Sequence, residues 1–387
     1  MLMGERADLV ILGGGLSGLA LAERLARSGA GGRVRILEPR EHYTDDRSWA
    51  FWTPTNSRWA ESATQTWDRW RCATRGAASV VASAEGWRYA YLRSSTIYES
   101  ALRAIADEPR ITLELGVRAG AITATAGGIE IASSAGPVTA RHVVDTRPPR
   151  PSHVAASRMF QCFAGREIAL DAPGIDDREV ELMTDMRADA LGFIFSYVLP
   201  LSPTRVLVEA TRFATRPLSA DVLAADLDAL IAARGWAQAP VLRTEQAVLP
   251  MGLPAAPEHR EIPGVVLAGT AAGALRAASG YGFLRIQAWA ERCAEALARS
   301  GRPIGHPKEP RLRQWMDEVF LRALTTDPAR APDFFMRLAG IAPTATFVRF
   351  LSDQATVIDL ARIVAALPPA PFLRALKPGP ATERRTA

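Results

Sequence analysis

The first forty residues constrain the fold most strongly. An apolar run at residues 8–12 precedes Gly13-Gly14-Gly15-Leu16-Ser17-Gly18, and a segment of helical periodicity follows at residues 19–26. This order predicts a strand, a tight turn and a helix. Gly13, Gly15 and Gly18 match the GxGxxG spacing, in which the glycines permit the turn, admit a pyrophosphate and let the helix pack on the strand. We therefore predict a Rossmann unit that binds a dinucleotide.

An acidic residue stands where such a unit needs one. The second predicted strand, residues 33–37, ends at Glu38, twenty residues beyond Gly18. A carboxylate here accepts hydrogen bonds from a ribose diol and repels a ribose 2′-phosphate, which disfavours NADP at this site. Leu16 and Ser17, within the glycine turn, complete the set of expected cofactor contacts in this region.

A later segment favours FAD over NAD. Residues 265–273 read as a strand that runs into small residues, and a helix is predicted over residues 282–298. In many flavoproteins the chain returns late to place a helix N-terminus near the flavin and its phosphates. We predict cofactor contacts at Gly269, Gly273 and Gly280, although Thr270 stands where such proteins usually have Asp.

Length and composition exclude several classes of protein. A chain of 387 residues with 48% hydrophobic and 22% charged residues predicts two interleaved globular domains. A net charge of +5 from mixed charges does not favour nucleic acid as a partner. Cys72, Cys162 and Cys293 lie far apart, which disfavours a disulfide framework, and no metal site is expected. No uncharged apolar stretch reaches the length needed to span a bilayer.

Four further segments resemble one enzyme family. Asp45-Asp46-Arg47-Ser48-Trp49-Ala50-Phe51-Trp52 resembles the DDxTWxF segment of lycopene β-cyclases, and residues 246–251 resemble their EEGxLPI region. Residues 269–281 match the spacing of their GxxxGLxHPxTGYS stretch, and residues 192–211 resemble their YTLPLS and FLEET strands. The resemblance runs from Ala7 to Phe350 and carries four motifs in order.

This resemblance implies a fold and an activity. The implied fold is α/β: a Rossmann-type FAD-binding domain interleaved with an antiparallel β-sheet substrate domain, followed by a C-terminal helical subdomain, as in para-hydroxybenzoate hydroxylase-like flavoproteins. The implied activity is proton-initiated closure of β-ionone rings on lycopene, giving γ-carotene and β-carotene. It requires reduced FAD, with NAD(P)H as a possible reductant, and involves no net redox change. The first acid of the FLEET motif maps onto Glu209, which the resemblance makes the proton donor and acceptor.

The chemistry specifies what Glu209 needs. A carboxyl group that donates a proton near neutral pH must be protonated there, and burial raises its pKa by penalising the charged form. Val206-Leu207-Val208 precede Glu209 and predict a buried strand. The alternative is an exposed glutamate at a strand end that pairs with Arg205 or Arg212.

Aromatic side chains are candidates for the walls of a polyene cavity, because their faces stabilise cations. Ordinary core packing is the alternative for each of them. Asp46 is a candidate contact of the flavin or the substrate, with Asp45 beside it. The aromatic candidates are Trp49, Phe51, Phe193, Phe195, Tyr197 and Tyr281.

Three positions depart from the family pattern. The second acid of the FLEET motif is Ala210, the HP pair is Arg276-Ala277, and an upstream Asp falls at Thr184. These departures leave open a cyclase of another acyclic terpenoid. The same fold is also compatible with an FAD-dependent monooxygenase or prenyl reductase and with a non-catalytic carotenoid carrier, because fold alone does not determine function.

The domain boundaries follow from these assignments. We assign residues 1–75, 95–150 and 245–300 to the FAD-binding domain and residues 76–94 and 151–244 to the substrate domain, whose sheet is expected to contain the strand near Trp87–Leu92. Residues 301–376 are expected to form a helical cap, and residues 377–387 a disordered tail. With 11 Arg/Lys, 7 Asp/Glu and many aromatic residues after position 310, the cap is a candidate for resting on the cytoplasmic side of a bacterial membrane as a peripheral protein. The oligomeric state is left open.

Overall fold

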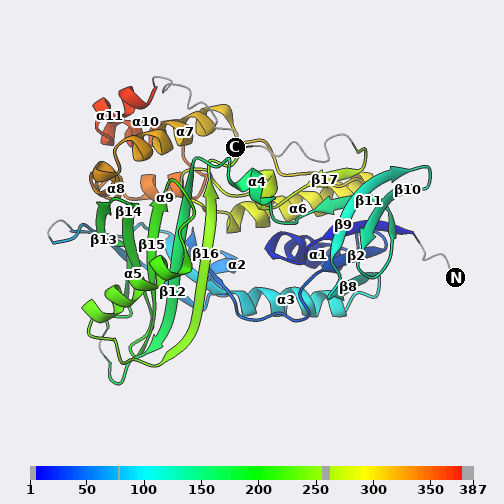
Figure 1. Ribbon diagram of the computed structural model, residues 1–387, viewed down its shortest axis with the longest axis horizontal. Helices are drawn as coiled ribbons and strands as arrows, with labels where there is room; N and C mark the ends of the chain where they lie inside the picture. The colour runs from blue at the N-terminus through cyan, green and yellow to red at the C-terminus, as the bar shows by residue number, and fades with distance from the viewer. Residues whose placement is uncertain (1–5, 77–78, 174, 255–261, 377–387) are drawn as a thin grey trace.

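The computed structural model describes residues 6–76, 79–173, 175–254 and 262–376. A Rossmann-type α/β unit and a long β-sheet lie side by side beneath a group of C-terminal helices (Figure 1). The predicted disordered tail, residues 377–387, lies outside the described residues.

The α/β unit is built on a seven-stranded sheet. β1 (Ala7–Leu12) pairs in parallel with β2 (Val34–Glu38) and β11 (Val138–Asp145), and β2 pairs in parallel with β8 (Ile111–Leu115). β17 (Val265–Leu267) adds to β11 in parallel, and β9 (Ala119–Thr125) and β10 (Gly128–Ser133) extend the sheet antiparallel. The late return of the chain to this sheet, predicted from residues 265–273, is confirmed.

Three helices cover one face of this sheet. Apolar side chains of α1 (Leu16–Ser28), α3 (Ser94–Ala106) and α6 (Phe283–Ser300) form one buried cluster with those of β1 and β2. Trp289 of α6 is fully buried there, and its indole N–H donates to the carbonyl of Ile304. Residues far apart in the sequence therefore build a single Rossmann core.

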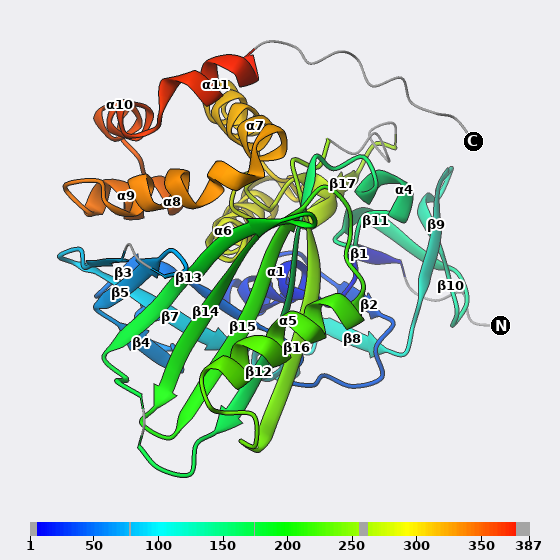
Figure 2. The same ribbon diagram turned by 60° about the vertical axis from the view of Figure 1, so that its left-hand side comes forward.

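A second seven-stranded sheet carries the cavity. The side chains of its long central strands alternate between two faces: one packs against α5 (Ala220–Ala233), and the other faces the interior (Figure 2). In sheet order the strands are β16 (Val241–Met251), β12 (Met159–Ala169), β15 (Arg205–Ala214), β14 (Gly192–Ser202), β13 (Glu179–Asp189), β5 (Arg69–Ala73) and β6 (Ser79–Ala82).

A small third sheet corrects one expectation. β7 (Trp87–Arg93) pairs with β3 (Ser48–Pro54) and β4 (Gln65–Trp67), and not with the long sheet. The strands that join the long sheet from this part of the chain are β5 and β6. The prediction that Trp87–Leu92 joins the long sheet is wrong, because a strand pattern reveals buried faces but not partners.

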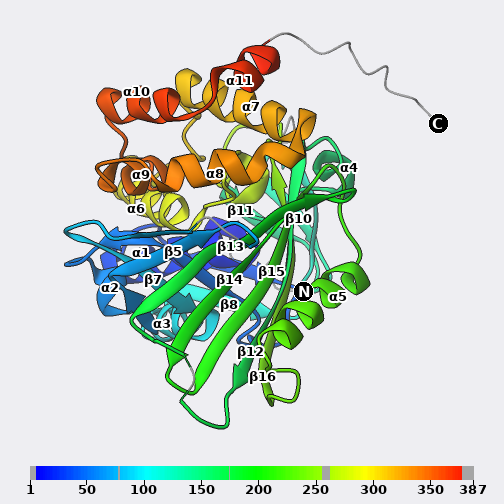
Figure 3. The same cartoon turned by 90° about the vertical axis from the view of Figure 1, so that its left-hand side faces the viewer.

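The C-terminal helices form a cap above the sheets (Figure 3). They are α7 (Arg311–Thr326), α8 (Ala331–Ala339), α9 (Ala345–Leu351), α10 (Val357–Ala366) and α11 (Pro369–Leu376). Short helical turns complete the chain at α2 (Arg58–Glu61), α4 (Pro151–Val154), η1 (Thr270–Ala272) and η2 (Pro328–Arg330). Within the described ranges, no helix combines the length and the apolar character needed to cross a bilayer.

Candidate active site

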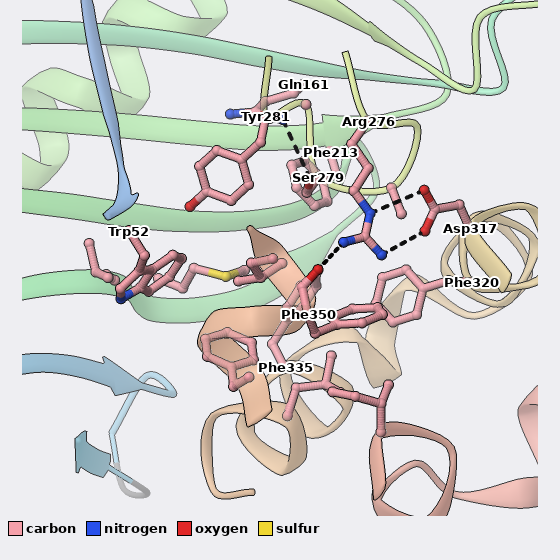
Figure 4. A pocket seen from close by; sticks show the side chains of 18 of the residues that line it. Trp52, Gln161, Phe213, Arg276, Ser279, Tyr281, Asp317, Phe320, Phe335 and Phe350 are labelled. Atoms are coloured by element: carbon pink, nitrogen blue, oxygen red, sulfur yellow. Dashed lines mark hydrogen bonds and ion pairs between the residues drawn. The ribbon is translucent and has the colours of Figure 1, made fainter. Parts of the chain in front are cut away.

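A cavity of about 430 Å³ lies between the interior face of the long sheet, the small sheet and the cap. Its walls also include residues 276–283, which connect β17 to α6 (Figure 4). Most of the lining is apolar. The polar and charged side chains among the lining residues are Ser48, Tyr89, Tyr91, Gln161, Tyr197, Glu209, Glu245, Arg276, Ser279, Tyr281 and Asp317.

Two carboxyl groups meet on the floor of this cavity. Glu209 lies in the middle of β15, and its register partners are Tyr197 on β14 and Gly165 on β12. Gly165 in turn pairs with Glu245 on β16. Because residues in register across a sheet point to the same face, Tyr197, Glu209 and Glu245 all project into the cavity from one row.

Gly165 provides the space for this row. A Cβ atom at position 165 would lie 2.7 Å from the Cγ of Glu209 and 3.2 Å from the Cγ of Glu245. A larger residue would therefore collide with Glu209 and crowd Glu245. The glycine is required by the close approach of the two carboxyl side chains.

Glu209 has the environment of a protonated acid. Among the described residues it has no hydrogen-bond or ion-pair partner, so neither Arg205 nor Arg212 pairs with it. Burial, and then the negative charge of Glu245, raises the pKa of Glu209 well above its usual range, whereas Arg243 opposes this shift. The exposed strand-end alternative is wrong, because Glu209 lies within a strand that faces the cavity.

Glu245, in contrast, is held by several donors. The Ser48 hydroxyl donates to its Oε1 and Oε2 at 2.8 and 2.9 Å, and Arg243 Nη1 donates to Oε2 at 2.9 Å. Arg243 Nη2 also donates to the Tyr91 hydroxyl at 2.8 Å. Glu245 is therefore an ion-paired carboxylate beside an unpaired carboxyl group.

A charge network fixes Arg243 from behind. Its Nε lies 3.3 Å from Glu167 Oε2 and 3.8 Å from Asp45 Oδ2. Arg93 Nη2 lies 2.6 Å from Asp45 Oδ2 and 3.7 Å from Glu167 Oε2, and Arg205 also pairs with Glu167. Asp45 and Ser48 come from the segment that resembles DDxTWxF, so this segment braces the carboxyl row.

The aromatic candidates divide into two groups. Trp49, Tyr197 and Tyr281 line the cavity. Phe51 instead stacks on Phe283 with ring centroids 4.6 Å apart. Phe193 and Phe195 are buried in the adjoining core, where Phe193 stacks on the cavity-lining Phe335 at 5.1 Å, and neither lines the cavity itself.

At the cap end, a buried ion pair forms part of the wall. Arg276 and Asp317 are each only 2% exposed, with Arg276 Nη2 3.2 Å from Asp317 Oδ1. Figure 4 shows the guanidinium between this carboxylate and Phe350, whose carbonyl it also binds. The guanidinium carbon lies 4.2 Å from the centre of the Phe350 ring. Arg276 thus ties the 276–283 segment to α7 and α9.

The remaining two departures from the family pattern do not line the cavity. Ala210 packs toward α5 on the opposite face of the long sheet. Thr184 is buried in the sheet, where its Oγ1 lies 3.0 Å from the Ser196 hydroxyl. Of the three departures, Arg276 is therefore the one that changes the cavity wall.

The predicted cofactor residues of the Rossmann unit come together. Glu38 is buried, and its carboxylate accepts from the Gly14 N–H at 2.6 Å and from the Arg40 N–H at 2.9 Å. Although burial alone raises it, the pKa of Glu38 is lowered overall by hydrogen bonds from Arg40 and Gly14. A Cβ at Gly18 would lie 2.0 Å from the Gly13 carbonyl oxygen, so only glycine lets α1 approach the turn.

The geometry fits a dinucleotide with its phosphates at helix ends. A Cβ at Gly15 or Gly273 would meet no atom within 4 Å, and a Cβ at Gly269 would lie 3.1 Å from the hydroxyl of Ser17, beside the Leu16 start of α1. No side chain among the described residues caps α1 or α6, which leaves their first backbone N–H groups available to an anion.

The remaining predicted cofactor residues, Gly280 and Asp46, have different surroundings. Gly280 lines the cavity beside Gln161, whose Oε1 is buried without a partner among the described residues. Asp46 pairs with Arg47 at 2.6 Å and accepts from the Tyr98 hydroxyl at 3.1 Å, so it faces the Rossmann unit. Asp45 lies between the Rossmann unit and the carboxyl row: its Oδ1 accepts from the Ser94 hydroxyl and the Ser95 N–H at the start of α3, and its Oδ2 lies 3.8 Å from Arg243 Nε. No group of His, Cys, Asp and Glu suited to a metal ion occurs in the part of the chain that the structure describes.

A family model described as lycopene cyclase protein matches residues 8–377. The chain belongs to the lycopene cyclase family. The family resemblance predicted from the motifs is thus confirmed.

Curated relatives agree with this assignment. Lycopene β-cyclase of Pantoea ananas is 29% identical over 62% of this chain and 64% of its own length, and that of Paracoccus sp. is 30% identical over the same shares. The chain thus spans just under two thirds of these two relatives. The lycopene β-cyclase of Pseudescherichia vulneris is 25% identical over 94% of this chain and 95% of its own.

Solved structures confirm the predicted fold class. A geranylgeranyl bacteriochlorophyll reductase-like protein from Thermoplasma acidophilum has a TM-score of 0.58 at 14% identity, covering 94% of this chain and 96% of its own. p-Nitrophenol 4-monooxygenase from Pseudomonas putida has the same score at 16% identity, covering 95% and 98%. A probable FAD-dependent monooxygenase from Pseudomonas aeruginosa scores 0.52 at 15% identity, covering 94% and 99%. This family member therefore shares the fold of FAD-dependent monooxygenases and reductases.

Several residues of this cyclase-family site were not among the candidates predicted from the sequence. Glu245 directly precedes the segment compared with EEGxLPI, and that position is a usable signal. Ser48 lies inside the DDxTWxF-like segment, and this position is a second usable signal. No local signal marks Gly165 or Asp317, because their roles depend on strand register and on the packing of the cap.

Proposed function

We propose that this protein is a lycopene β-cyclase that closes β-ionone rings at the ends of lycopene, forming γ-carotene and β-carotene. The observation that carries the proposal is Glu209, a carboxyl group with a raised pKa in the wall of a largely apolar cavity, where no described residue pairs with it. Such a group holds a proton at neutral pH and can deliver it to an alkene.

The proton returns to the same residue by the end of the reaction. Glu209 donates its proton to the terminal carbon–carbon double bond, which leaves a tertiary cation. An internal double bond attacks this cation, the new carbon–carbon bond closes the ring, and the cation moves to the ring. A neighbouring carbon then returns a proton to the Glu209 carboxylate, so the product is an isomer of the substrate.

Protection of the cation is the second requirement, since water would convert it to an alcohol. Apolar side chains of the cap exclude water from the cavity, and the rings of Trp49, Tyr197 and Tyr281 offer electron-rich faces. When bound, reduced FAD supplies a further electron-rich surface without net transfer of electrons. NAD(P)H is a reductant suited to producing that form.

Two segments would hold FAD. Glu38 and the turn at Gly13–Gly18 would bind the adenosine and pyrophosphate, and the segment from Gly269 to Gly280 would place the flavin at the cavity. Gln161 offers a buried amide oxygen at this end that no described residue pairs with. Arg40 donates to the Gly14 carbonyl of this turn, and Asp46 accepts from the Tyr98 hydroxyl of α3.

The cap suits a membrane surface as the source of an apolar substrate. Trp315, Val364, Leu373 and Leu376 line the cavity and are also exposed, at 52%, 59%, 60% and 43%. Apolar side chains that are continuous from an outer surface to a cavity provide a route for a lipid-soluble polyene. We propose peripheral attachment to the cytoplasmic side of the membrane through this surface.

The test is anaerobic turnover of lycopene in lipid vesicles with chemically reduced FAD, comparing the wild type with Glu209→Gln. We expect the wild type to form cyclic products of unchanged mass and Glu209→Gln to lose about 10²–10⁴-fold in rate, which is the usual contribution of general acid–base catalysis. Chromatography and mass spectrometry follow the products.

Three results would overturn the proposal. Products that gain oxygen or hydrogen would assign a monooxygenase or reductase instead. Cyclisation of another acyclic terpenoid but not of lycopene would change the substrate. An unchanged rate in Glu209→Gln would exclude this residue as the acid, and a matched Glu181→Gln variant, which removes a carboxylate paired with Arg234, controls for general effects.

A further inference from the structure

We infer that Glu245 is a positioning residue for the proton of Glu209: a fixed negative charge that keeps the proton on Glu209 until substrate arrives and then stabilises the cation formed beside it. The inference deepens the proposed function and rests on it for the identity of the reaction. It concerns a residue that lies in the same cavity wall but has different hydrogen-bond partners from Glu209.

The first step of the argument is proximity. Both γ-carbons lie within close contact distance of a single point, the absent Cβ of Gly165. Like charges that share such a site cannot both be ionised cheaply, so one group retains its proton. The sheet fixes this geometry, because β15 and β16 both pair with β12 along ladders that are in register at Gly165.

The second step decides which group carries the charge. Glu245 accepts from Ser48 and Arg243, whereas Glu209 has no such partner among the described residues. Donors stabilise the charged form of a carboxylate. The negative charge therefore stays on Glu245 and the proton on Glu209.

The surrounding charges hold this asymmetry in place. Arg93, Arg205 and Arg243 lie among the carboxylates of Asp45 and Glu167 behind Glu245. The hydroxyls of Tyr89, Tyr91, Tyr197 and Tyr281 and the thiol of Cys72 also line the cavity, and burial raises their pKa values, so they remain neutral. Glu245 thus supplies the neighbouring negative charge that acts on Glu209.

The negative charge of Glu245 has opposite effects on the two proton transfers of the reaction. A neighbouring negative charge makes Glu209 a weaker acid, which slows the first transfer. The same charge keeps Glu209 protonated at neutral pH and attracts the positive charge that develops in the cavity. It also makes the Glu209 carboxylate a stronger base for the final proton transfer. The proton leaves Glu209 and later returns to it, whereas no covalent bond to Glu245 forms or breaks.

The experiment is an infrared titration of protonated carboxyl groups in the FAD-loaded enzyme, with Glu209→Gln used to assign the Glu209 band. In Glu245→Gln we expect the apparent pKa of that band to fall by about one to three units, because a like charge has been removed. The alkaline limb of the pH profile for lycopene turnover should move down by the same amount. Glu245→Asp retains the charge and should restore much of both.

Controls separate charge from folding. Glu181→Gln removes a carboxylate that pairs with Arg234 beyond α5, and it should leave the Glu209 band unchanged. If Glu245→Gln does not fold, Gly165→Ala provides a second variant, because its Cβ forces the two side chains apart and should shift the band in the same direction.

The outcomes distinguish the two proposals. A Glu209 band that does not move in Glu245→Gln or Gly165→Ala overturns the role of Glu245, even if the wild type cyclises lycopene. A band that moves in an enzyme that fails to act on lycopene overturns the proposed substrate and supports the carboxyl pair.

Discussion

At one end of the cavity, Glu209 and Glu245 place two carboxyl groups over Gly165, whereas at the other end Arg276 and Asp317 pair opposite charges. Within the described part of the chain, the first arrangement leaves one carboxyl group without a hydrogen-bond or ion-pair partner. The second pairs both charges between the cap and the 276–283 segment. The buried carboxyl group of Glu209 is suited to proton transfer, whereas the buried Arg276–Asp317 ion pair connects parts of the cavity wall. The difference predicts that changes at the two ends have effects of different kinds.

The largest effect is expected at the paired end. Arg276→Ala leaves Asp317 buried without its cation, which should lower the free energy of unfolding by about 3–5 kcal/mol. Urea denaturation measures this loss. The double variant Arg276→Leu/Asp317→Leu removes both charges and should regain most of it, although the Phe350 carbonyl remains unpaired. Equal losses of unfolding free energy in the single and double variants would show that the loss does not come from an unpaired Asp317.

A pH-dependent effect is expected at the unpaired end. Because the pKa of Glu209 is raised in the folded protein, the unfolded state loses this proton first as pH rises above about 4.3. Between the unfolded and folded pKa values, wild-type stability should therefore fall relative to Glu209→Gln by about 1.4 kcal/mol per pH unit. Unfolding midpoints at a series of pH values measure the difference. Parallel curves for the two proteins would contradict a protonated Glu209.

The smallest effect is expected at the cavity mouth. Leu373→Ser removes an exposed apolar side chain that also lines the cavity, so it should weaken vesicle binding by about 1–2 kcal/mol without lowering stability. Flotation with vesicles measures the binding. Leu242→Ser, half exposed at the start of β16 and outside the cavity lining, is the matched control. Equal losses in both variants would remove the cap as the membrane contact.

Local spacing is sufficient to predict the Rossmann unit. Gly13, Gly15 and Gly18 followed by Glu38 specify a strand, a turn, a helix and an acid within one short segment, and the structure brings them together. Glu209 is identified through its motif and its apolar neighbours. Both signals lie within a few residues of the feature they predict.

The carboxyl pair cannot be predicted in this way. Glu209, Gly165 and Glu245 are brought together by the register of three strands separated by long stretches of chain, and strand register does not follow from composition. The same limit explains why the sequence places β7 in the wrong sheet. It also explains why Phe193 is a cavity candidate, although Phe335 lies between it and the cavity. Which buried aromatic residues line a cavity depends on what packs against them.

The order of the elements along the chain also determines when each part can form during synthesis. β17 and α6, which complete the Rossmann sheet and bury its helical face, follow every strand of the long sheet. Until residues 265–300 leave the ribosome, the apolar face of α1 lacks the helix that carries Trp289. The nucleotide-binding half therefore begins first and is finished after the long sheet, so the protein can acquire its cofactor cradle only once the wall bearing Glu209 and Glu245 has been made.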